Sequence, residues 1–153
     1  MALPAPNDHM AFALDEAAAA ATRGEVPVGA VIVDATGRVL SRAGNRTREL
    51  ADPTAHAEIL AIRAACSARG SERLPDCDLY VTLEPCAMCA AAISFARIRR
   101  VYYAAPDPKG GGIAHGPRIF AQPTCHHAPE VYDGLSEAEA AALLRSFFAD
   151  RRG

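Results

Sequence analysis

The chain has 153 residues, of which 50% are hydrophobic and 22% are charged, and this balance excludes an intrinsically disordered protein. Its formal net charge of −2 excludes the strong overall basic field that many nucleic-acid-binding proteins carry. The alanine-rich stretch at residues 17–21 is far too short to cross a bilayer, so the composition indicates a globular protein without a membrane span.

The length and the cysteines indicate one domain in a reducing compartment. We interpret residues 1–153 as a single domain, because a chain of this size can bury a substantial core. The N-terminus lacks the basic-then-apolar order of a secretory signal. The five cysteines are an odd number, which does not suggest a set of paired disulfides. We therefore expect a cytoplasmic protein with reduced thiols and no membrane partner.

Helical and strand-like segments alternate along the chain. Val26 to Val33 is apolar and β-branched, which is typical of a buried strand. Four residues recur at helical spacing and predict the buried face of a helix that has Thr54 as its N-cap, namely Ala55, Ile59, Ile62 and Cys66. Such alternation indicates an α/β fold with three layers, α-β-α, and a central sheet of about five strands. In chain order, the pattern predicts a helix at 7–23, strands at 26–33 and 38–43, a helix from 54, a strand at 78–83, a helix through 90–96, strands at 98–104 and 130–132, and a helix at 135–150.

Two short motifs concentrate the chemically active side chains. One imidazole, from His56, and two thiols, from Cys86 and Cys89, supply three N/S ligands. Three such ligands suit a catalytic zinc ion whose fourth position is open to water. The carboxylate of Glu58 is then free to carry protons. The motifs are Thr54-Ala55-His56-Ala57-Glu58 and Glu84-Pro85-Cys86-Ala87-Met88-Cys89.

The spacing within the motifs places these side chains over helix ends. Cys86 and Cys89 are three residues apart, so they share one face of a helix whose first turn we expect to contain Pro85. Residues two apart do not share a helix face, so His56 and Glu58 can both reach a site only if it lies over the start of their helix. A helix start also favours the thiolates that zinc requires. A redox or structural C-x-x-C beside a core histidine is the alternative that spacing leaves open.

Two polar loops flank the motifs. Asn45 lies in the loop that leads into His56, where its amide can reach the site or simply bond to its own backbone. The glycine-rich loop at residues 106–112 contains Asp107 and Lys109 and cannot form regular structure. Three histidines follow without metal-ligand spacing, and we expect them at a surface or an oligomer contact: His115, His126 and His127.

Together the two motifs resemble the H-x-E…P-C-x-x-C signature of the zinc-dependent cytidine and deoxycytidylate deaminase family. The resemblance implies the cytidine-deaminase-like fold, a homodimer, and one Zn²⁺ per chain held by the imidazole and the two thiols. It also implies that Glu58 is the catalytic acid and base. Segments such as Val26-Pro27-Val28-Gly29-Ala30 and Leu143-Leu144-Arg145-Ser146-Phe147-Phe148 look like the branch of the family that deaminates adenosine in tRNA.

For that branch, the resemblance implies conversion of adenosine to inosine at the wobble position of a tRNA anticodon loop. It also implies a set of substrate-binding residues, namely Asn45, Ala57, Asp107, Lys109 and Phe148. Two alternatives stand beside this hypothesis. One is a deaminase of a free base such as guanine or cytosine, and the other is an inactive partner subunit. The presence of Glu58 argues against the inactive subunit.

Overall fold

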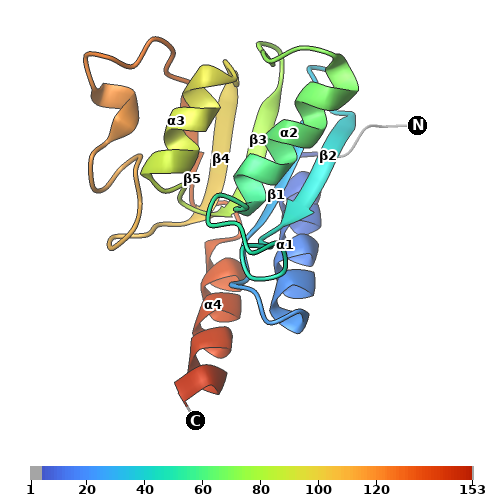
Figure 1. The fold of residues 1–153 in the computed structure, drawn as a ribbon, viewed down its shortest axis with the longest axis vertical. Coiled ribbons are helices and arrows are strands. Elements are labelled where there is room, and N and C mark those ends of the chain that lie inside the picture. Colours follow the sequence, from blue (N-terminus) through green and yellow to red (C-terminus); the bar gives the residue numbers. More distant parts are fainter. Residues whose placement is uncertain (1–4, 153) are drawn as a thin grey trace.

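The computed structural model describes residues 5–152 and contains one mixed sheet of five strands (Figure 1). The strands are β1 (Gly29–Val33), β2 (Val39–Gly44), β3 (Asp78–Leu83), β4 (Arg100–Ala105) and β5 (Glu130–Asp133). Their order across the sheet is β2-β1-β3-β4-β5. β1 is antiparallel to β2 and β3, whereas β3, β4 and β5 run parallel to one another.

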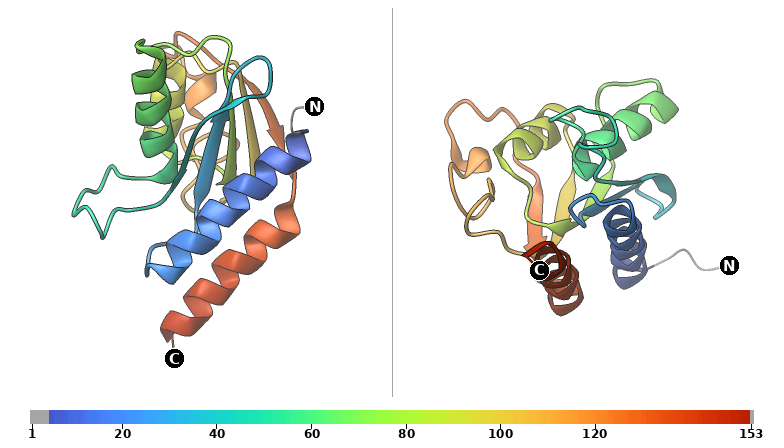
Figure 2. Two further views of the ribbon diagram at one scale, coloured as in Figure 1. Left: turned by 90° about the vertical axis from the view of Figure 1, so that its right-hand side faces the viewer. Right: turned by 60° about the horizontal axis from the view of Figure 1, so that its bottom comes forward.

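Two helices cover each face of the sheet (Figure 2). α1 (Pro6–Thr22) and α4 (Glu137–Arg152) lie side by side on one face, and α2 (Ala57–Arg69) and α3 (Ala87–Phe95) lie on the other. A separate apolar cluster fills the space on each side of the sheet. This arrangement confirms the predicted three-layer α-β-α fold. No helix within residues 5–152 is long and apolar enough to cross a membrane.

Small side chains bring α2 close to the sheet. Ala57, Ala61 and Ala65 are completely buried. The predicted buried face is confirmed only in part. Ala55 is buried but precedes α2, and Ile62 and Cys66 are half-buried and pack against the core beside the alanines. Ile59 is also half-buried. The spacing of the large apolar residues therefore marked the edge of the buried face, since alanine carries too weak a hydrophobic signal to mark its centre.

The sheet topology gathers several loop starts at one edge. The end of β2 pairs with the start of β1, through Gly44 and Gly29. The end of β3 pairs with the end of β4, through Leu83 and Ala105. The residues that follow β2, β3 and β4 therefore emerge together, and in open α/β sheets ligand sites form at such an edge.

Candidate active site

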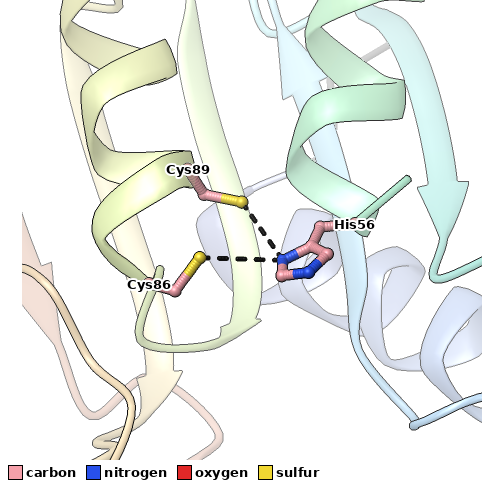
Figure 3. A group of neighbouring side chains, drawn as sticks. All are labelled: His56, Cys86 and Cys89. Carbon is pink, nitrogen blue, oxygen red and sulfur yellow. Dashed lines mark hydrogen bonds between the residues drawn. The ribbon is translucent and has the colours of Figure 1, made fainter. Parts of the chain in front are cut away.

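The three predicted metal ligands meet at the starts of two helices (Figure 3). His56 is the N-cap of α2 and Cys86 is the N-cap of α3. The ring of His56 points across to the two thiols, with its Nδ1 atom 3.7 Å from Sγ of Cys86 and 3.5 Å from Sγ of Cys89. The three ligand atoms all lie within 4.8 Å of one another.

This geometry fits zinc. In a tetrahedral site with Zn–S and Zn–N bonds of about 2.3 and 2.05 Å, a nitrogen and a sulfur ligand lie about 3.6 Å apart. The observed separations of 3.7 and 3.5 Å bracket that value. A set of one imidazole and two thiols is also the donor set expected for zinc in a catalytic site. The residues present therefore fit a bound Zn²⁺ ion in donor type and in nitrogen–sulfur separation.

Both helices begin later than the sequence predicted. Thr54 is not the N-cap of α2, because its hydroxyl donates to Oδ1 of Asp52 at 2.7 Å instead. Pro85 lies before the N-cap of α3 rather than in its first turn. The consequence is that His56 and Cys86 both occupy N-cap positions, where the positive end of a helix dipole favours negative charge.

The thiols are prepared for metal binding by their mutual contact. A hydrogen bond from the Cys89 thiol lowers the pKa of Cys86 to about 4. The same hydrogen bond, together with burial, raises the pKa of Cys89. A hydrogen bond to Cys86 in turn raises the pKa of His56. Because zinc binds thiolate and neutral imidazole, metal binding at this site must release protons.

Glu58 occupies the first turn of α2, where its side chain is only 4% exposed. Burial raises the pKa of Glu58 to about 7. A carboxyl group in this range can both accept and return a proton near neutral pH. His56 at the N-cap of α2 and Glu58 in its first turn both line one cavity. This placement confirms the prediction that the two side chains approach one site from the start of their helix.

A cavity of about 320 Å³ opens beside these residues. Its volume lies at the small end of the range of roughly 300–1,000 Å³ that is common for ligand sites, and this suits a single base. The lining residues come from five segments of the chain. They are Val26, Val28, Asn45, Thr47, His56, Ala57, Glu58, Leu83, Glu84, Cys86, Asp107 and Gly110.

The structure brings three of the five predicted substrate residues to this cavity. Asn45, Ala57 and Asp107 line it. Lys109 is exposed on the same loop as Asp107. Phe148 is 45% exposed on α4 and is not among the residues that line the cavity. Lys109 and Phe148 can therefore meet only those parts of a substrate that extend beyond the cavity.

Sequence reasoning did not identify two buried carboxylates beside the cavity. Glu25 accepts hydrogen bonds from the backbone amides of Arg48 and Glu49, at 3.1 and 2.8 Å. Although burial acts to raise the pKa of Glu25, these hydrogen bonds outweigh it and hold the pKa below its ordinary value. Glu84 is equally buried and also accepts backbone amides. The sequence pattern that could have revealed them is an acidic residue directly beside an apolar strand. A carboxylate buried at such a position needs several hydrogen-bond donors.

The chain also matches a known protein family. The model of the cytidine and deoxycytidylate deaminase zinc-binding region matches residues 5–105. That range covers all three predicted metal ligands, Glu58 and Asn45. The match therefore includes every residue of the two motifs.

Individual relatives agree with the family match. The chain is 66% identical over 143 residues to the protein of Agrobacterium fabrum named tRNA-specific adenosine deaminase, which covers 94% of this chain and 93% of that protein. It is 41% identical over 144 residues to the Bacillus subtilis protein of the same name, with 94% of this chain and 89% of that protein covered.

Two solved structures are also similar to this chain, and the one with the higher identity is a tRNA deaminase. A structure of a tRNA:A34 deaminase that carries out A-to-I editing at the wobble position of transfer RNA superposes with a TM-score of 0.87 and 67% identity, over 89% of this chain and 98% of that chain. The guanine deaminase of Bacillus subtilis superposes with a TM-score of 0.68 and 32% identity, over 98% of this chain and 96% of that chain.

Proposed function

This chain belongs to the cytidine and deoxycytidylate deaminase zinc-binding family, and on that premise we propose that it converts adenosine to inosine at the wobble position of a tRNA anticodon by zinc-dependent hydrolysis. The observation that carries the proposal is the meeting of His56, Cys86 and Cys89 with the buried Glu58 at one cavity. The identity of 66% to a tRNA-specific adenosine deaminase supports the choice of substrate.

We propose one Zn²⁺ ion per chain, held by Nδ1 of His56 and by the sulfur atoms of Cys86 and Cys89. When bound, zinc acts as a Lewis acid and makes water nucleophilic near neutral pH. Glu58 accepts one proton from the attacking water and returns it to a ring nitrogen of the adenine. It then takes the second proton, from the hydroxyl group that has been added to the ring, and passes it to the amino group, which leaves as ammonia while the new C=O bond forms. The burial of Glu58 keeps bulk water from competing for these protons.

The cavity walls recognise the base. The side chain of Asn45 can donate and accept hydrogen bonds at a base edge. The backbone of Asn45 is fixed, because its amide donates to the carbonyl oxygen of Val28 at 3.1 Å. Ala57 is the first residue of α2, where a backbone amide has no acceptor within the helix and is free to bind substrate. An unpaired loop base enters such a pocket at the lowest cost in lost stacking.

Residues outside the cavity hold the flanking nucleotides. Lys109 offers a cation to the RNA backbone, and Phe148 offers an exposed ring on which a neighbouring base can stack. Asp107 contributes in two ways. It lines the cavity, and its Oδ1 atom accepts the backbone amides of Lys109 and Gly110, at 3.2 and 3.0 Å, which shapes the loop. A tRNA substrate implies a cytoplasmic enzyme, and we propose that residues 5–152 form one deaminase domain.

We also propose a homodimer. The support is a pair of exposed apolar side chains on α3, where Phe95 is 75% exposed and Met88 is 36% exposed. Burying such side chains against a second copy is favourable, since isolated proteins rarely leave large apolar patches open. We expect Phe95→Asp to give monomers by analytical ultracentrifugation, whereas Leu50→Asp, at an exposed leucine of another surface, leaves dimers. Monomeric wild-type protein would contradict the proposal.

The substrate is tested with an anticodon stem-loop that carries adenosine at the wobble position. We expect editing there, read by sequencing as A-to-G, and none when the adenosine is moved by one nucleotide. Asp107→Ala should reduce editing more than Asp107→Asn, because asparagine keeps the Oδ1 acceptor that shapes the loop. If the stem-loop stays unedited while free guanine or cytosine releases ammonia, the free-base deaminase replaces this proposal, and the similarity to guanine deaminase would favour guanine.

A further inference from the structure

A single buried carboxylate holds both ends of the loop that borders the cavity. Glu84 follows β3, and its side chain is completely buried. Its Oε1 atom accepts the backbone amide of Asp107 at 3.0 Å and the ring Nδ1 of His115 at 2.7 Å. Its Oε2 atom accepts the backbone amides of Ile113, Ala114 and His115, at 3.2, 3.0 and 3.2 Å. Five donors from the loop at 107–115 therefore converge on one side chain.

The middle of this loop is packed against Glu84 and against the start of α3. A Cβ atom on Gly111 would lie 2.3 Å from Oε2 of Glu84, which no real contact permits. A Cβ atom on Gly112 would lie 2.6 Å from the backbone nitrogen of Ala87 in α3. The amide of Gly112 also donates to the carbonyl oxygen of Pro85 at 2.8 Å. The glycines thus allow the loop to fold tightly onto the segment that begins α3.

The anchored loop forms part of the cavity rim. Asp107 and Gly110 line the cavity, and Lys109 is exposed at the tip of the loop. Glu84 is two residues before the metal ligand Cys86, so it joins the rim to the chain segment that holds the metal. A displacement of this loop would move the rim relative to the reacting base.

We propose that Glu84 and His115 are positioning residues that hold the loop at 107–115 in the shape that grips the RNA beside the target base. This inference rests on the proposed tRNA substrate. His115 acts through Glu84 and does not touch the base. Hydrogen bonds to an ionised group are roughly twice as strong as neutral ones, and the short contact to His115 closes the far end of the loop onto the carboxylate.

His115 is the residue at which the inference can be tested without unfolding the site. Its side chain is 36% exposed, so its removal leaves no buried cavity. Glu84 keeps its four backbone donors when the imidazole is removed. His115→Ala deletes the side-chain donor, whereas His115→Asn can place an amide N–H near the position of Nδ1.

Steady-state kinetics on the anticodon stem-loop give the first readout. We expect His115→Ala to raise KM about tenfold with kcat within about twofold of wild type, because loss of a charged hydrogen bond loosens the grip on RNA and leaves the reacting groups in place. His115→Asn should restore KM to within about threefold of wild type. An unchanged KM in His115→Ala, a loss confined to kcat, or equal impairment by alanine and asparagine would overturn the inference.

Proteolysis gives a second readout that needs no RNA. Lys109 is the only lysine in the chain, so a protease that cleaves after lysine can cut only within this loop. Cleavage requires the loop to leave its anchor, and its rate follows the population of the open form. We expect His115→Ala to be cut about tenfold faster than wild type, while His115→Asn and the exposed control His126→Ala are cut at close to the wild-type rate. Equal rates in all four proteins would overturn the inference.

The two readouts separate this inference from the proposed function. If wild-type protein does not edit the stem-loop, the tRNA substrate is refuted, and the role in gripping RNA is refuted with it. The proteolysis rates then still decide whether His115 holds the loop. If wild-type protein edits the stem-loop and the His115 variants behave alike in both assays, only the positioning role is refuted.

Discussion

Glu58→Gln is the sharpest test of the chemistry. The glutamine side chain has nearly the same size and shape as glutamate, so the first turn of α2 can keep its packing. Glutamine cannot accept a proton and return it, which removes the step that we assign to Glu58. The substitution does not remove a metal ligand, because the ligand atoms belong to His56, Cys86 and Cys89.

The burial of Glu58 sets the size of the expected loss. A positioned acid or base contributes roughly 10²–10⁴ in rate. At 4% exposure, bulk water cannot easily take over the proton transfer. We therefore expect kcat/KM to fall by about 10³, which corresponds to about 4 kcal/mol of transition-state stabilisation at 1.36 kcal/mol per tenfold.

The assay combines turnover with metal analysis. Single-turnover editing of the stem-loop measures the chemical step, and mass spectrometry measures zinc per chain. Glu49→Gln is the matched control, because it makes the same chemical change in an exposed side chain that pairs with Arg46 at 2.7 Å. We expect the control to stay within about twofold of wild type. A Glu58→Gln protein that holds full zinc and edits within tenfold of wild type would refute the acid–base role.

Cys86→Ser should lose stoichiometric zinc and have a lower Tm, because metal binding and folding are coupled. The control Cys66→Ser, at a half-buried cysteine, should retain zinc, and full zinc in Cys86→Ser would contradict the ligand assignment. Phe148→Ala should raise KM for the stem-loop about tenfold, which corresponds to the loss of one stacked base. Phe147 is only 9% exposed, so Phe147→Ala should instead lower the free energy of unfolding by about 3 kcal/mol, measured by denaturant titration. Glu25→Gln should lower the free energy of unfolding at pH 7 by about 2 kcal/mol, because charged hydrogen bonds are lost. Because the pKa of Glu25 is lowered in the folded protein, the stabilisation by its carboxylate is present above about pH 5 and is lost as the pH falls through that lowered pKa. The free energy of unfolding of Glu25→Gln should therefore depend less on pH below about pH 5 than that of wild type. Parallel pH dependences in the two proteins would refute the role of the Glu25 carboxylate.

Local patterns were sufficient to predict most of the elements. β3 covers the same residues, 78–83, that the apolar pattern predicted. The predicted last helix and the observed α4 differ by two residues at each end. Element starts that depend on capping were less predictable, as at Thr54, because aspartate or threonine can bond within a turn just as well as at a helix end.

The chemistry of the site was also readable in the sequence, because zinc requires particular donor atoms and short local spacings. Cys86 and Cys89 are brought to one helix start by three residues of separation alone. Whether His56 meets them, at a separation of 30 residues from Cys86, depended on the fold. The sheet order places α2 and α3 side by side on one face, and this brings the two helix starts together.

The sequence by itself determined which residues supply the donors and the proton carrier, since these are properties of side-chain type and local spacing. Only the tertiary structure decided how the rim of the cavity is held. Glu84 and His115 are 31 residues apart, and nothing in their local sequence links an acidic strand end to a histidine in an irregular loop. The contact exists because β3 and β4 end at the same edge of the sheet. A carboxylate buried there must find donors, and the returning loop supplies them.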